Sequence, residues 1–142
     1  MRLAARLALV VLIGQNLVLG VWATFAPRQW FDTFPGGGRT WVSIDGPYNE
    51  HLVRDVGAAV LAVGLLALWA AIRPERLLLG AAGAANAVFG LPHVIYHLRH
   101  LGVYANASDK VASAGGLVFT TACALFVVFV AVTSKPTTSA AG

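Results

Sequence analysis

Four apolar stretches of about twenty residues each constrain this chain more than any other feature of its sequence. They cover about residues 3–25, 52–72, 77–98 and 111–132. A helix of about 20 apolar residues crosses the roughly 30 Å hydrocarbon core of a bilayer. Charged residues make up 11% of the chain, against about 25% in soluble domains. The sequence therefore predicts an all-α fold, a single four-transmembrane-helix bundle covering residues 1–142.

The first stretch also has features of a secretory signal peptide, because Arg2 and Arg6 precede its apolar run. The run is about twice as long as a usual signal-peptide core, and it contains Gln15 and Asn16. Pro27 would also follow the obvious cleavage point after Ala26. We expect a retained helix.

Basic residues in the short connections predict the orientation. With the N-terminus inside, five fall on each side, namely Arg2, Arg6, Arg73, Arg76 and Lys135 inside, and Arg28, Arg39, Arg54, Arg99 and Lys110 outside. The arginines before the first helix usually dominate, and most acidic residues accompany the outer set. We therefore expect a multi-pass protein of the inner (plasma) membrane with cytoplasmic N- and C-termini.

The segment from Pro27 to Glu50 is the only long connection between the spans, and it is rich in aromatic residues. These are Trp30, Phe31, Phe34, Trp41 and Tyr48. Trp and Tyr favour the headgroup region of a bilayer, where an apolar ring and a polar tip are both accommodated. The sequence predicts an aromatic outer loop that caps the bundle, with a turn at Pro35–Gly38.

Small residues within the spans indicate close helix packing. They cluster at residues 57–64, 80–87 and 115–116. In lipid, close backbone approach replaces hydrophobic burial as the main source of helix association. We expect all three clusters to lie at helix contacts, and Ser108 to be the N-cap of the fourth helix.

Polar residues gather on one stripe of the third span. At about 100° per residue, Asn86, His93, His97 and His100 fall within about 60° of one another. His93 and His97 are four residues apart, a spacing that lets two imidazoles reach one ion from one helix face. The alternatives are hydrogen bonds to neighbouring helices, with Asn86 or Gln15 as partners, and a role in proton handling or substrate contact.

The start of the second span supplies the remaining candidate site residues. Glu50 with Arg54, and His51 with Asp55, are four residues apart and can pair on a helix. Asp55 would hold one nitrogen of the His51 ring and leave the other available. We predict an outward-facing site of His51, Asp55, His93 and His97. In this site His51, His93 and His97 would hold a metal ion or a haem.

Two resemblances bear on the family. The chain's size, its four spans and the arginine near the start of the second span resemble the DoxX-like membrane proteins, which implies a redox accessory role. Residues 46–57 (GPYNEHLVRDVG) and 92–98 (PHVIYHL) are similar to a group of uncharacterised small bacterial membrane proteins, which implies no particular activity.

Two functions from different classes remain open. The first is a non-catalytic accessory or assembly subunit of a membrane complex, with the lipid bilayer and other membrane subunits or further copies of itself as partners. The alternative is a metal- or haem-binding redox protein. Scattered basic residues argue against nucleic-acid binding. An enzyme is the less favoured reading, because the spans lack a Ser or Cys nucleophile near a His and lack a pair of carboxylates.

Overall fold

The computed structural model describes residues 3–134. The helices are α1 (Leu3–Phe25), α2 (Pro27–Thr33), α3 (Glu50–Ile72), α4 (Arg76–Arg99) and α5 (Ala107–Thr133), with the short 3-10 helix η1 (Leu101–Val103). A two-stranded antiparallel hairpin, β1 (Pro35–Gly36) and β2 (Arg39–Thr40), lies between α2 and α3. The all-α class is confirmed, and α1, α3, α4 and α5 are each long and apolar enough to cross a membrane.

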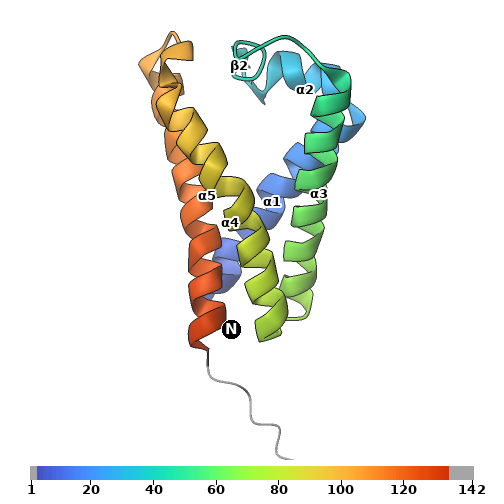
Figure 1. Cartoon of the computed structure of the whole chain (residues 1–142), viewed down its shortest axis with the longest axis vertical. Helices are drawn as coiled ribbons and strands as arrows, with labels where there is room; N and C mark the ends of the chain where they lie inside the picture. Colours follow the sequence, from blue (N-terminus) through green and yellow to red (C-terminus); the bar gives the residue numbers. More distant parts are fainter. Residues whose placement is uncertain (1–2, 135–142) are drawn as a thin grey trace, which may run out of the picture.

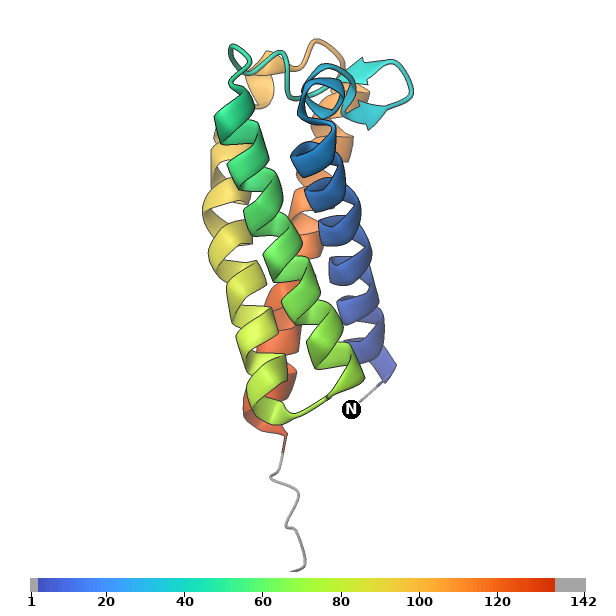
Figure 2. The ribbon, with the colours of Figure 1, turned by 90° about the vertical axis from the view of Figure 1, so that its right-hand side faces the viewer.

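The four long helices run antiparallel to their sequence neighbours and form two closely packed pairs. α1 packs most extensively on α3, and α4 on α5, while α1–α5 and α3–α4 are lesser contacts (Figures 1 and 2). α2, the hairpin and η1 lie at one end, which we call the capped end; the α3–α4 turn lies at the other, the tail end. The two pairs diverge toward the capped end (Figure 1).

Glycines account for the close approach within each pair. A Cβ on Gly20 would lie 2.6 Å from the backbone nitrogen of Leu61, and one on Gly64 2.9 Å from Asn16 Cβ. In the other pair, a Cβ on Gly83 would lie 2.9 Å from Val128. The predicted close approach is therefore confirmed for the clusters of the second and third spans.

The third small-residue cluster behaves differently. Gly115 and Gly116 of α5 are exposed, and a Cβ on either would meet nothing within 4 Å. The prediction that these glycines pack within the bundle is wrong, because this part of α5 turns them away from the other helices.

In each helix pair, one arginine joins the two helices at their ends. Arg54, near the start of α3, donates to the Thr24 carbonyl at the end of α1. Arg76, the first residue of α4, donates to the carbonyl oxygens of Ala131 and Val132 at the end of α5, both at 2.8 Å. The last carbonyls of a helix have no partner within it, and a cation there also complements the helix dipole.

Three of the long helices, α3, α4 and α5, extend beyond their predicted spans at one or both ends. Asn49 caps α3, and its side chain accepts a hydrogen bond from Leu52 N at 3.1 Å. α5 begins at Ala107 with Asn106 at the N-cap position, so the prediction of Ser108 as N-cap is wrong. The polar start of α5 lies outside the apolar window, so hydropathy alone placed its beginning too late.

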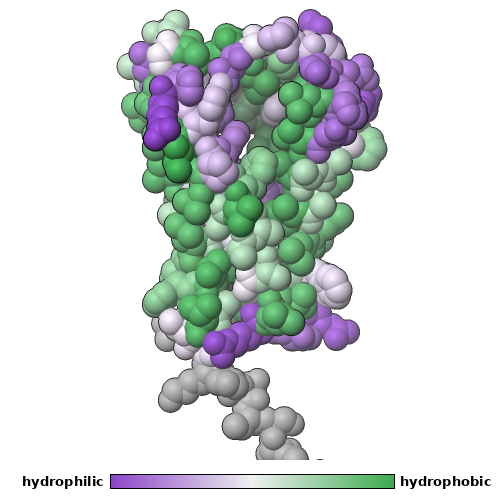
Figure 3. Space-filling model, in the orientation of Figure 1, coloured by the Kyte–Doolittle hydropathy of each residue, from purple (hydrophilic) through white to green (hydrophobic). Residues whose placement is uncertain are grey.

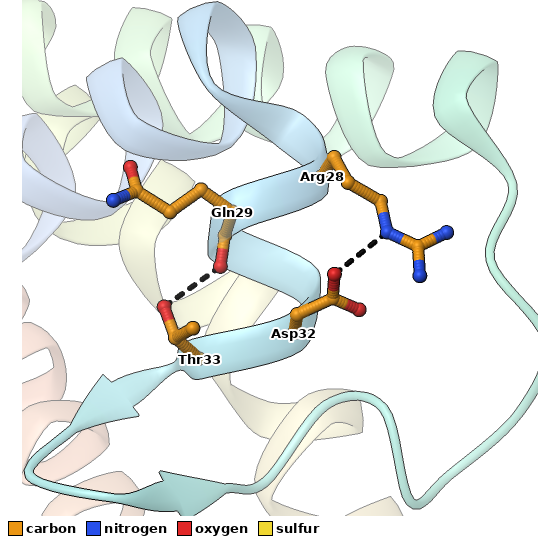
Figure 4. Close-up of polar contacts among 4 residues, drawn as sticks. All are labelled: Arg28, Gln29, Asp32 and Thr33. Atoms are coloured by element: carbon orange, nitrogen blue, oxygen red, sulfur yellow. Dashed lines mark hydrogen bonds and ion pairs between the residues drawn. The ribbon is translucent and has the colours of Figure 1, made fainter.

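The aromatic segment is more ordered than the predicted loop. It contains α2, which begins with Pro27 at a position where a missing N–H costs nothing. Arg28 pairs with Asp32 at 2.6 Å, and the Thr33 hydroxyl donates to the Gln29 carbonyl (Figure 4). Gly36, Gly37 and Gly38 have φ of 98°, 65° and 79°, which explains the triple glycine at the predicted turn.

The surface pattern matches a bundle with an apolar exterior. Figure 3 shows a hydrophobic central zone between hydrophilic ends, with paler hydrophilic residues reaching down from the capped end. Large apolar side chains in this zone are exposed, among them Val18 (62%), Trp69 (57%), Val88 (75%) and Phe129 (55%). Small residues fill much of the interior, as in the core cluster around Leu9, Ala67, Ala82 and Val127.

Candidate functional site

The polar stripe of α4 forms a series of stacked rings. His93 and His97 lie edge to face with their ring centres 4.6 Å apart, and Phe89 stacks on His93 at 5.3 Å. Both imidazoles are half-buried. No hydrogen bond joins either ring to another residue within 3–134. The spacing of four residues therefore brings the two imidazoles together, as the sequence predicts.

Two residues that were not predicted as part of the site, Tyr96 and Asp45, lie next to this stripe. Tyr96 lies 5.5 Å from the His97 ring and stacks on His100 at 4.1 Å. Its hydroxyl donates to Asp45 Oδ1 at 3.4 Å, which ties the loop before α3 to the end of α4. At about 100° per residue Tyr96 lies about 80° from Asn86, just outside the stripe, so the helical wheel did not include it in the site. Its contact with Asp45 depends on tertiary structure.

His51 and Asp55 pair as expected, with His51 Nε2 3.2 Å from Asp55 Oδ2. Glu50 and Arg54 also pair, at 2.9 Å. The His51 and Asp55 side chains are 86% and 61% exposed. Within residues 3–134 no hydrogen bond, ion pair or ring contact links them to His93 or His97. No group of three or more His, Cys, Asp or Glu side chains in the described part of the chain is arranged to hold a metal ion.

The structure therefore brings the four candidate residues together as two pairs, one on α3 and one on α4. α3 and α4 diverge toward the capped end, where both pairs lie (Figure 1). A shared site for a metal ion or haem that uses His51 together with His93 and His97 stays a prediction.

A buried amide pair joins the two halves of the bundle. Asn16 of α1 donates from Nδ2 to Asn86 Oδ1 at 2.7 Å, and Asn86 Nδ2 donates to the Ala82 carbonyl at 2.8 Å. Both side chains are buried, at 5% and 7% exposure. The sequence analysis considered a histidine as the hydrogen-bond partner of Asn86, whereas in the structure its partner is the Asn16 amide.

A shallow, open groove of about 620 Å³ lies between α3 and α4, toward their middle. Its lining comprises Val63, Ala85, Val88, Phe89, Pro92 and His93. Apart from His93, these side chains are apolar. Pro92 has no N–H, so the Val88 carbonyl also lacks its usual donor within the helix.

A second, smaller hollow of about 290 Å³ lies at the capped end, between the hairpin and the connection from α4 to α5. Arg39 Nε lies 3.3 Å from Asp109 Oδ1 across it. Trp41 packs edge to face on Tyr104 at 5.9 Å, and Tyr104 shares a 3.0 Å hydrogen bond with Ser113. These contacts fasten the hairpin to the start of α5.

The aromatic cap also contacts the start of α3. Tyr48 packs edge to face on Phe31 at 5.2 Å, and the Arg28 guanidinium lies 4.9 Å from its ring centre. Partial loss of water, and then the negative charge of Glu50, raise the pKa of the Tyr48 phenol above its ordinary value of 10.0. The phenol is therefore neutral at physiological pH, and its ring packs against Phe31 and the Arg28 guanidinium.

Compared with protein-family models, curated proteins and solved structures, the chain matches none of them.

Proposed function

We propose that the chain is a multi-pass membrane protein that serves as a non-catalytic accessory or assembly subunit of a membrane complex. Both termini are cytoplasmic, and the capped end faces outward. The observation that carries the proposal is the exposed glycine face of α5, formed by Ala112, Gly115, Gly116 and Phe119.

This face has the spacing of a helix contact, but among residues 3–134 nothing lies within 4 Å of a Cβ built on Gly115 or Gly116. Ala112 is three and four residues before Gly115 and Gly116, and Phe119 is four and three residues after them, so all four lie on one side of α5. Glycine within a helix costs about 1 kcal/mol relative to alanine, and it offers lipid no side chain to pack. A second helix can approach such a surface closely, and this approach is what stabilises helix pairs in lipid. The partner is another membrane subunit or a second copy of the chain.

A comparison of two exposed glycines tests the proposal. Gly14 of α1, like Gly116, is exposed and has open space around its Cβ position. The protein is extracted from its native membrane in a mild detergent, and the mass of the particle is measured by light scattering and native mass spectrometry. We expect a defined assembly larger than one chain, which Gly116→Ile disrupts and Gly14→Ile leaves intact.

A monomeric wild-type particle would overturn the proposal. So would an assembly that both substitutions leave intact, because the glycine face would then have no role in it. Gly116→Ala serves as a milder variant if the isoleucine variant fails to accumulate, and it should weaken the assembly less.

A further inference from the structure

His93 occupies an unusual position in the groove between α3 and α4. It is the one titratable side chain in a lining that is otherwise apolar, and its ring has no hydrogen-bonding partner in the described chain. Under the proposed membrane location, on which this inference rests, the groove faces hydrocarbon. An imidazole there has lost its water, which is costly unless a partner replaces it. A molecule of the bilayer can supply that partner.

Polar groups continue from the groove toward the capped end in contact with one another. His97 lies 4.6 Å from the His93 ring, Tyr96 lies 5.5 Å from His97, and the Tyr96 hydroxyl reaches Asp45. Asp45 is exposed and forms no ion pair with any residue in 3–134. From the groove toward the capped end, the order is therefore an apolar surface, two imidazoles on α4, and the carboxylate of Asp45 in the loop before α3.

That order complements one class of bilayer molecule. An acyl chain fits an apolar groove, the ester and phosphate oxygens of a phospholipid accept hydrogen bonds from imidazole N–H groups, and a primary ammonium pairs with a carboxylate. An anionic headgroup without an ammonium would instead meet the negative charge of Asp45. Charge complementarity thus favours a zwitterionic aminophospholipid.

We propose that the α3–α4 groove binds one aminophospholipid of the leaflet at the capped end. Its acyl chain lies along Val88 and Phe89, its glycerol ester and phosphate oxygens accept hydrogen bonds from His93 and His97, and its ammonium lies at Asp45.

The test uses the full-length protein in nanodiscs with a known lipid composition. Equal amounts of phosphatidylethanolamine, phosphatidylcholine and phosphatidylglycerol are supplied, and native mass spectrometry identifies the lipid that stays bound after release from the disc. We expect one phosphatidylethanolamine per chain, retained at least tenfold over phosphatidylglycerol.

Substitutions then locate the site. Val88→Trp fills the groove and should abolish retention, whereas Val18→Trp places the same ring on an exposed face of α1 and should not. Asp45→Asn should keep the bound lipid but lose the preference for phosphatidylethanolamine over phosphatidylglycerol. His93→Leu should lower retention because it removes the donor to the lipid oxygens.

Equal retention of the three lipids by the wild type would overturn the proposal, as would equal loss in Val88→Trp and Val18→Trp. These results are separable from failure of the proposed accessory role. Membrane insertion and the mass of the assembly are measured on the same preparations, and neither depends on the lipid in the groove.

Discussion

The hydrogen bond between Asn16 and Asn86 allows a quantitative prediction. The two amides lie 2.7 Å apart in an apolar interior and join α1 to α4, which belong to different helix pairs. Removing one partner of a buried hydrogen bond leaves the other unsatisfied and costs roughly 1–3 kcal/mol. In membrane bundles the coupling of such pairs averages about 0.6 kcal/mol and reaches about 1.7 kcal/mol.

The two single substitutions should differ. Asn86→Ala leaves the Asn16 amide without its partner, and it also removes the bond from Asn86 to the Ala82 carbonyl. Asn16→Ala removes only one of the two bonds that Asn86 makes, and its Cβ keeps the contact with Gly64. We therefore expect Asn86→Ala to lower the free energy of unfolding more than Asn16→Ala does.

Steric trapping or a reversible denaturant titration in detergent micelles measures the four members of the double-mutant cycle. The double variant should be more stable than the sum of the single effects predicts, by about 0.5–1.5 kcal/mol. Strict additivity would mean that the two amides do not interact, and a more damaging Asn16→Ala would contradict the assigned hydrogen-bond pattern.

Three further predictions concern the helix ends and the histidines. Arg76→Met should lower the free energy of unfolding by about 1 kcal/mol because it frees two carbonyls of α5, whereas Arg73→Met, at the adjacent turn, should have little effect in the same titration. His97→Ala should lower the melting temperature because the ring is half-buried between two others, while exposed His100→Ala should change it little. If a metal ion or haem binds, elemental analysis or a Soret band will show it in the purified protein, and His51→Ala will remove it. If both signals are absent, the histidines are structural or lipid-binding groups.

The sequence predicted the long helices well because length and apolar composition decide whether a segment can span a bilayer. The predicted and observed bounds of α1 agree, and α3 and α4 differ from their predicted spans by one or two residues at a few ends. α2 was missed because seven residues with mixed polarity carry no clear helical period. The arginine contacts to Thr24 and Ala131 were missed because they depend on which helix ends meet in space.

For the candidate site, the spacing of residues within one helix predicted which side chains meet, but the sequence did not predict how residues of different helices are placed. The pairs His93–His97 and His51–Asp55 each lie four residues apart on one helix, so a helical wheel was enough to predict their contacts. Whether the two pairs meet depends on the angle between α3 and α4, which no periodicity encodes. The same holds for Gly115, whose exposure depends on how α5 is rotated about its axis.

The four-span arrangement, on which the proposals rest, is tested most directly by labelling two introduced cysteines from outside the cell. Cys123→Ala removes the native thiol, and a cysteine is then placed at Ser43, at the capped end, or at Glu75, in the turn at the tail end. In intact cells a membrane-impermeant maleimide should label the Ser43 position, and it should label the Glu75 position only after the membrane is permeabilised. Labelling of the Glu75 position alone in intact cells would contradict the orientation, and equal labelling of both would contradict the membrane-spanning bundle itself.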